Sequence, residues 1–326
     1  MRFVFRFSVL SLLVFLAYPS FAEEPGYAQL LRAGELGTQG QFRATISVLE
    51  ALVQPGADTL TGANVGVAWN MLGSAHQYLG EYDQARRCYE QAINILKAAP
   101  NSPLDYASAI DNLGSVESSM NQYEAAKVLR QKARHLYEIA GNHAGISRTS
   151  SNLALMELTH GYLHAARKDM SKALSEAQLA KEPGDTLTDD DIGAMDTIQG
   201  SLAMTEQDYR AAIAAYQHAI DLWTSHHGPQ YYLLGLAYPL RADALDKLGN
   251  HQQAIADMRH ALAILDTSLG QSNPSYLNTQ LNYARLLRET GAKEEAARIE
   301  TAANAGLANA RRQQCSGCTI SAAGFR

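Results

Sequence analysis

Apolar and small residues recur along this chain at intervals of three and four positions, the spacing that places them on one face of an α-helix. The clearest stretch begins at Trp69, breaks at Gly80 and resumes from Tyr82 to Tyr89. A glycine between two such stretches marks a turn, because it ends one helix before the next begins. The pattern therefore predicts two α-helices joined by a tight turn.

The same two-helix pattern returns along the chain. Its copies start near residues 26, 66, 107, 147, 193, 235 and 277, so successive copies lie 40 to 46 residues apart. One helix pair leaves an apolar face that only the neighbouring pair can cover, and such pairs stack into a solenoid. We therefore expect a single all-α array over residues 23–304, rather than the two domains that the length would suggest.

Three positions in each of the second to seventh copies hold alanine or glycine. Two packed helices approach to about 8 Å only where neither carries a large side chain, so small residues at fixed positions indicate close helix contacts. In the second to seventh copies these residues are Gly73, Ala85, Ala92, Gly114, Ala126, Ala133, Ala154, Ala166, Ala173, Gly200, Ala212, Ala219, Ala242, Ala254, Ala261, Ala284, Ala296 and Ala303.

These residues resemble the tetratricopeptide motif, which has small residues at its eighth, twentieth and twenty-seventh positions and a turn glycine at its fifteenth. The spacing is similar to the 42-residue variety of kinesin light chains, and residues 273–284 also resemble that variety's inter-repeat loop and following helix. The resemblance covers about residues 26–304. It implies a right-handed superhelical solenoid of about seven helix pairs.

The chain continues to favour a helix after the last repeat, as far as about Arg312. We therefore expect the final helix to run on as a C-terminal cap. Residues 305–326 then comprise the end of this capping helix and a cysteine-containing tail.

The first 22 residues have the composition of a secretory signal peptide. Arg2 and Arg6 precede an apolar stretch from Phe7 to Tyr18, and Ala22 stands at a small-residue cleavage position. The apolar part is shorter than the roughly 20 residues that span a membrane, and no later stretch approaches that length. The sequence predicts a periplasmic or secreted protein without membrane insertion after cleavage; an uncleaved anchor is the alternative.

The charge balance argues against nucleic acid as a partner. The whole chain has 27 basic residues, and loss of Arg2 and Arg6 leaves 25 against 33 acidic residues, a formal charge of −8. Binding to phosphate backbones normally requires a basic face, which this composition lacks.

The first helix of each pair is expected to line the concave side of the array. The resemblance implies that asparagines near the fifth and sixth motif positions bind the backbone of an extended peptide, since an Asn side chain both donates and accepts. Alternatively, these side chains bond within the helix stack or to water. The matching residues are Asn70, Asn112, Asn152 and Asn282, and Arg148 and Arg285 are cations at inward positions.

An inserted loop separates the fourth and fifth pairs. Residues 182–191 are rich in glycine, proline and acids, and we expect them to divide the array into two slightly mobile halves. The acids from Asp189 to Asp191 are interpreted as a helix start, because carboxylates cap free backbone N–H groups and suit the helix dipole.

Cys315 and Cys318 have the two-residue spacing of redox and metal motifs, and the nearby Arg311 and Arg312 would favour a thiolate. A thioredoxin-type motif belongs to a βαβ fold, which the predicted array lacks. In an exported chain the spacing favours a local disulfide. Covalent tethering of another chain, thiol–disulfide exchange and zinc binding remain as alternatives.

Motifs for catalysis or for cofactors are absent from the sequence. It contains neither a phosphate-binding loop nor a recognisable nucleophile turn, and His226 and His227 have no third metal ligand at a suitable spacing. We therefore predict no enzyme activity, no cofactor and no metal site. The predicted function is a scaffold that binds a protein or peptide on its concave face; a self-associating structural protein is the other alternative.

Overall fold

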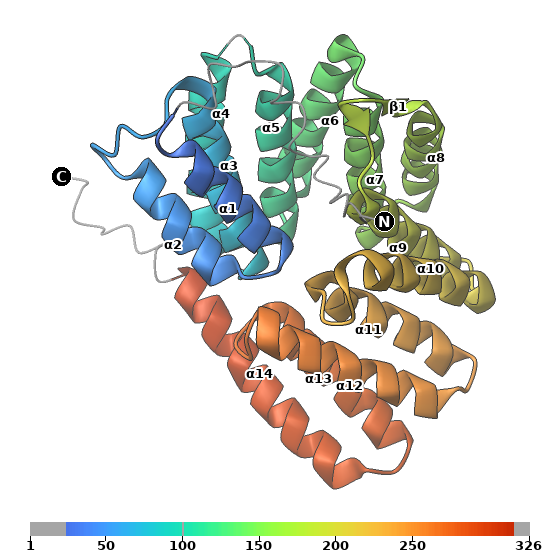
Figure 1. Ribbon diagram of the computed structural model, residues 1–326. Coiled ribbons are helices and arrows are strands. Elements are labelled where there is room, and N and C mark those ends of the chain that lie inside the picture. Colours follow the sequence, from blue (N-terminus) through green and yellow to red (C-terminus); the bar gives the residue numbers. More distant parts are fainter. Residues whose placement is uncertain (1–23, 100, 316–326) are drawn as a thin grey trace, which may run out of the picture.

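The computed structural model describes residues 24–99 and 101–315. Within these residues the chain forms seven helix pairs and one short β-hairpin, and the pairs follow one another as a superhelical solenoid (Figure 1). The predicted all-α array is confirmed, whereas the predicted signal segment, residues 1–22, lies outside the described residues. The pairs are α1 (Tyr27–Thr38) and α2 (Phe42–Val53), α3 (Gly62–Tyr78) and α4 (Tyr82–Lys97), α5 (Pro103–Ser119) and α6 (Tyr123–Ala140), α7 (His143–Thr159) and α8 (Leu163–Leu179), α9 (Asp189–Thr205) and α10 (Tyr209–His227), α11 (Tyr232–Lys247) and α12 (His251–Ser268), and α13 (Pro274–Glu289) and α14 (Lys293–Cys315).

From the second pair onward, the first helix begins three or four residues before the start predicted from the motif. Helix α3, for example, begins at Gly62 rather than near residue 66 and contains 17 residues, and its partner α4 contains 16. The additional residues of the long repeat therefore lengthen the helices. The turns within pairs stay at three residues, and the middle residue of each has a positive φ: Gly40, Gly80, Asn121, Gly161, Gln207, Gly249 and Gly291.

The small positions lie at the predicted helix contacts. A Cβ atom on Gly73 would approach the Tyr89 ring to 2.7 Å, closer than packed atoms come. The alanines at the second and third small positions are all 0% exposed, so a larger side chain would have no space. They are Ala85, Ala92, Ala126, Ala133, Ala166, Ala173, Ala212, Ala219, Ala254, Ala261, Ala296 and Ala303.

The last helix continues beyond the repeat, as predicted. Helix α14 has 23 residues and ends at Cys315, three residues after the expected end at Arg312. Its side chain Leu307 packs against the same apolar cluster as α11 and α13. Among the described residues, no helix has both the length and the apolar character needed to cross a membrane.

The loop between the fourth and fifth pairs is attached to the array. It contains the antiparallel strands β1 (Lys181–Glu182) and β2 (Asp185–Thr186). The Asp185 carboxylate accepts hydrogen bonds from the backbone N–H groups of His143 (3.0 Å) and Ala144 (2.7 Å) at the start of α7. This capping contact ties the loop back to the fourth pair. The slight mobility of the two halves of the array stays a prediction.

The loop ends at the predicted helix start. The Thr188 hydroxyl accepts a hydrogen bond from the Asp191 N–H at 3.1 Å, and the Asp191 carboxylate accepts one from the Thr188 N–H at 3.0 Å. This reciprocal capping box satisfies two backbone donors at the start of α9.

A buried carboxyl group between the third and fourth pairs makes stability depend on pH. Glu157 is 3% exposed, and its nearest cation, the Lys127 ammonium, lies 3.8 Å away. Burial, reinforced by the Asp169 carboxylate, raises the pKa of Glu157 to about 7 despite Lys127. Because this pKa exceeds the unfolded value of about 4.3, the native state binds the proton more tightly, and this contribution to stability falls as pH rises between those values.

We expect Glu157→Gln to raise the free energy of unfolding at pH 8 by on the order of 2 kcal/mol, because glutamine removes the cost of ionising a buried carboxyl. At pH 5 the difference from the wild type should be small. Urea unfolding at both pH values measures it. Glu182→Gln, the same change at an exposed position in β1, is the control. An equal effect of the two substitutions at pH 8 would contradict the assignment.

Candidate functional site

The first helices of the pairs form one continuous layer. Each odd-numbered helix contacts the odd-numbered helix of the neighbouring pair, from α1 through α13, while each even-numbered helix packs against the first helix of the following pair. The odd-numbered helices therefore present the inner surface, as predicted for the concave side of a stacked array.

Three of the four predicted asparagines lie side by side on this layer. The Asn112 amide group donates a hydrogen bond to the Asn70 side-chain oxygen at 3.0 Å, which joins α5 to α3. The Asn152 amide group on α7 donates to the Asp111 carboxylate at 3.0 Å. These bonds connect three successive helices of the inner layer, and we call Asn70, Asn112 and Asn152 the asparagine row.

The asparagine row keeps part of its hydrogen-bonding capacity. Each of its side chains is half-buried. Among the described residues, the Asn70 amide group and the side-chain oxygens of Asn112 and Asn152 have no hydrogen-bond partner. The row therefore combines contacts within the stack, one of the two roles considered from the sequence, with free donors and acceptors for a ligand. Binding by these residues stays a prediction.

Asn282 is not part of this row. It lies half-buried on α13, and no hydrogen bond joins it to the other three asparagines within the described parts of the chain. The resemblance placed the four residues at the fifth or sixth motif position. The structure bonds Asn112 to Asn70, and Asn152 to Asp111, the residue next to Asn112.

The two predicted cations have different surroundings. Arg148 lies on α7 with its guanidinium 6.0 Å from the centre of the Tyr137 ring and 3.6 Å from the Asp191 carboxylate, and its side chain is 39% exposed. It is therefore accessible near the asparagine row. Arg285, by contrast, already contacts the carboxylates of Asp243 at 2.9 Å and Asp246 at 2.8 Å, so it joins α13 to α11.

One residue of the inner layer was missed in the sequence. Leu155 follows Asn152 by three positions, hence on the same face of α7, and is 41% exposed. The face of the helix that contains Asn152 was expected to be polar, and an apolar residue interrupts it here. That interruption in the sequence could have identified Leu155. It adds an apolar contact beside the asparagine row.

The described cysteines and histidines show no arrangement for redox or metal chemistry. Cys88 is buried, and burial raises the pKa of its thiol to about 11, so it is protonated and unreactive near neutral pH. Cys315 is the last residue of α14, whereas Cys318 lies outside the described residues, so their disulfide stays a prediction. His226 and His227 each lie 3.4 Å from a carboxylate, of Asp189 and Asp190 respectively. The described part of the chain has no group of three or more ligands arranged for a metal.

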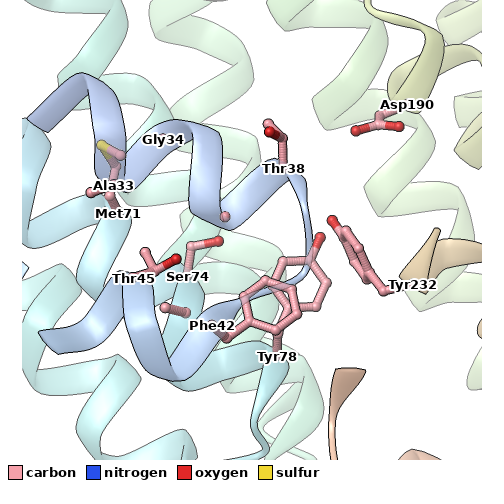
Figure 2. A pocket seen from close by; sticks show the side chains of 12 residues that line it. Ala33, Gly34, Thr38, Phe42, Thr45, Met71, Ser74, Tyr78, Asp190 and Tyr232 are labelled. Carbon is pink, nitrogen blue, oxygen red and sulfur yellow. The ribbon is translucent and has the colours of Figure 1, made fainter. Parts of the chain in front are cut away.

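The two ends of the array contact each other, which the sequence did not indicate. Phe42 and Tyr78 stack with ring centres 4.6 Å apart, and Tyr232 packs edge-on against both at 5.1 and 5.0 Å (Figure 2). Because Phe42 starts α2, Tyr78 ends α3 and Tyr232 starts α11, these rings join the first two pairs to the sixth.

A second contact joins the turn of the second pair to the start of α13, in the seventh pair. The Asn273 amide group donates a hydrogen bond to the Tyr78 carbonyl oxygen at 2.9 Å. In the turns, a Cβ atom on Gly40 would lie 3.2 Å from Tyr232, and one on Gly80 would lie 2.9 Å from Pro274. The turns of the first and second pairs thus rest on the starts of α11 and α13. We call this contact, formed by Gly40, Phe42, Tyr78, Gly80, Tyr232, Asn273 and Pro274, the seam.

Comparison with known proteins agrees with the repeat architecture. Residues 64–139 and 191–267, which cover most of the second, third, fifth and sixth pairs, match the tetratricopeptide-repeat family. Among curated proteins, kinesin light chain-related 3 of Arabidopsis thaliana is 24% identical over 231 residues. That match covers 70% of this chain but only 35% of the plant protein. Two segments of the chain therefore match tetratricopeptide repeats, and the chain spans about a third of the length of that relative.

Solved structures share the fold at low identity. The Rap conjugation gene regulator of plasmid pLS20, in complex with the Phr* peptide, has a TM-score of 0.65 and 15% identity, over 88% of this chain and 74% of that one. Aspartyl phosphate phosphatase F from Bacillus subtilis has a TM-score of 0.61 and 12% identity, over 86% and 70%. The APC/C hetero-tetramer Cut9-Hcn1 has 0.59 and 15%, over 86% and 48%. These similarities establish the superhelical fold and nothing beyond it.

Proposed function

We propose that this tetratricopeptide-repeat chain is a non-catalytic scaffold that binds an extended peptide, or an extended segment of a protein, on its inner surface. The observation that carries the proposal is the asparagine row. Its free amide and carbonyl groups can pair with the alternating donors and acceptors of a peptide backbone. Because backbone groups are the same in every peptide, the row supplies affinity, and neighbouring side chains supply selectivity.

Two neighbours of the row support this assignment. Arg148 offers an accessible cation and Leu155 an exposed apolar side chain, on the same helix as Asn152. The Rap regulator, a solenoid of similar fold, was solved in complex with the Phr* peptide, which supports a peptide as the ligand. The phosphatase among the similar structures shares only the fold, so its activity is not transferred to this chain.

We also propose that the chain is exported to the periplasm or to the outside of the cell. Support comes from the signal-like composition of residues 1–22, with two arginines, an apolar stretch and a small-residue cleavage position. Sequencing of the N-terminus of the chain recovered from the cell envelope tests export. Recovery of the chain only from the cytosol, with residues 1–22 intact, would contradict it.

Peptide binding is tested by removing two members of the row. We expect the double substitution Asn112→Ala and Asn152→Ala to weaken binding of a positional-scanning peptide library by about tenfold or more, since hydrogen bonds to the peptide backbone are lost. Fluorescence anisotropy with the labelled library measures the change. Binding should weaken for all sequences alike, because the lost contacts are to backbone groups.

The matched control is Asn94→Ala, an exposed asparagine on the second helix of a pair, α4. Binding to this variant should equal binding to the wild type. Circular dichroism of the double variant checks that the array is intact, because Asn112 also bonds to Asn70. Equal library affinity of the folded double variant and the wild type would remove the asparagine row from the site.

A further inference from the structure

A cavity of about 230 Å³ lies at the seam. The first two pairs form one wall, while Asp190 at the start of α9 and Tyr232 at the start of α11 form the other. Figure 2 shows the Asp190 carboxylate across the cavity from Thr38, with the hydroxyl end of Tyr232 between the two walls. Because its walls come from opposite ends of the array, the cavity is complete only while the seam is closed.

Two glycines in the cavity wall have no role in packing. A Cβ atom on Gly34 would have its nearest neighbour, the Met71 methyl group, at 3.5 Å, and one on Gly37 would lie 3.9 Å from the Thr45 hydroxyl. Both are ordinary contact distances, and neither glycine has a positive φ. Glycine weakens a helix relative to alanine. Because the two glycines have no side chains, they leave space in the cavity on the side formed by α1.

The chemistry of the walls suits a cation with an apolar stem. Phe42, Tyr78 and Tyr232 contribute aromatic rings, and Asp190 is the one charged residue of the described lining. Aromatic faces attract ammonium groups, and a carboxylate forms strong charge-assisted hydrogen bonds with them. Met71 also lines the cavity, and its apolar atoms offer a surface against which methylene groups would pack.

The bonding of Asp190 favours an ammonium over a guanidinium group. Its Oδ2 atom already accepts a hydrogen bond from the Tyr231 hydroxyl at 2.6 Å. Its Oδ1 atom is buried, without a hydrogen bond and 3.4 Å from His227, so only the Oδ2 atom can face a ligand. A guanidinium binds best with both oxygens of a carboxylate, whereas an ammonium is a point charge that one oxygen can satisfy. Burial, and then Asp191 and Asp189, raise the pKa of Asp190, so an added cation would favour its ionised form.

We propose that this seam cavity binds the side chain of a lysine residue of the peptide held on the inner surface. The methylene groups lie against Phe42 and Met71, and the ammonium group lies between the aromatic rings and Asp190. The inference rests on the proposed function, because it names a residue of the same ligand. A lysine bound there contacts both ends of the array and therefore stabilises the closed seam.

The cavity is tested directly with small probes on the full chain. Saturation-transfer NMR with Nα-acetyl-lysine methylamide should detect binding about tenfold stronger than binding of Nα-acetyl-norleucine methylamide, which has the methylene groups without the charge. Asp190→Asn should abolish this difference. Asp189→Asn removes the same charge from a residue outside the lining and should preserve it. Equal binding of both probes by the wild type, or an unchanged difference in Asp190→Asn, would overturn the proposal.

The cavity glycine provides a second, independent readout. Gly34→Ala should weaken lysine binding several-fold while raising the melting temperature, because alanine favours the helix and meets no clash. Gly73→Ala should lower the melting temperature, since its Cβ atom would lie 2.7 Å from Tyr89. Loss of stability in Gly34→Ala would show that the glycine serves packing. Unchanged lysine binding would show that the space left by Gly34 is not occupied by the lysine, and would overturn the cavity assignment.

The peptide library separates failure of the cavity from failure of the proposed function. Enrichment of lysine at one peptide position, lost in Asp190→Asn and kept in Asp189→Asn, supports both the lysine site in the cavity and the peptide-binding function. Bound peptides without lysine preference would overturn the cavity assignment and leave the scaffold function standing. Binding of the lysine probe with no library peptide bound would overturn the scaffold function, and with it the assignment of the lysine to a peptide.

Discussion

Replacement of Arg241 by alanine is expected to lower the free energy of unfolding by about 3 to 5 kcal/mol, because it leaves a buried carboxylate without its cation. The Arg241 guanidinium donates two hydrogen bonds to Asp257, at 2.8 and 2.6 Å, and the two residues are 8% and 3% exposed. It also donates to Gln217. One side chain thus joins α11 to α12 and to α10.

Urea unfolding followed by circular dichroism measures the loss. The matched control is Arg167→Ala, which breaks an ion pair with Glu206 at 2.7 Å whose side chains are 53% and 42% exposed. That change should cost about 1 kcal/mol or less, because water screens exposed charges. The double replacement Arg241→Met and Asp257→Leu should recover most of the stability, since it removes both charges. Similar losses at Arg241 and Arg167 would contradict this account.

Replacement of Tyr232 by alanine is expected to open the seam and to lower the free energy of unfolding by about 3 kcal/mol. The ring is 6% exposed and contacts both Phe42 and Tyr78. Its removal leaves a cavity between the ends of the array, while contacts between neighbouring pairs are preserved. Small-angle X-ray scattering should therefore report a larger radius of gyration for a chain that keeps its helix content.

The matched control for the seam is Tyr162→Ala, because Tyr162 is 53% exposed and lies within a turn of the array. Its radius of gyration should equal that of the wild type. Hydrogen exchange adds local information: the turns at residues 39–41 and 79–81 should exchange faster in Tyr232→Ala only. Unchanged scattering and exchange in that variant would mean that the seam does not hold the two ends together in solution.

The seam has a consequence for ligand binding. In an open solenoid, the inner surface is accessible along its whole length, whereas the seam brings the first two pairs against the sixth and seventh. A ligand on the asparagine row lies on α3, α5 and α7, and the seam cavity lies between α1, α3 and the starts of α9 and α11. A peptide that occupies both places would bind a closed array, and Tyr232→Ala should weaken its binding.

The local architecture of the repeats could be predicted from the order of the amino acids. Helical spacing of apolar residues and the small residues at three repeated positions predicted seven pairs, and these positions are where the helices touch: Ala126, Ala166 and Ala212 are each 0% exposed. The capping acids at the start of α9 and the continuation of α14 were also predicted. All of these features depend on residues close in the chain or in the next repeat, so a periodic pattern contains them.

Contacts between residues far apart in the chain could not be predicted from the repeats. Asn273 and the Tyr78 carbonyl group are 195 positions apart, and no periodic pattern relates them. Their contact depends on the curvature that accumulates over five repeats, which small rotations at every helix crossing determine together. The same holds for the inner layer: the fifth and sixth motif positions gave four asparagines, and the stacking of α3, α5 and α7 decided that Asn112 bonds to Asn70 and Asn152 to Asp111. Arg285 was predicted only as a cation at an inward position, and the position of α11 gives it Asp243 and Asp246 as partners.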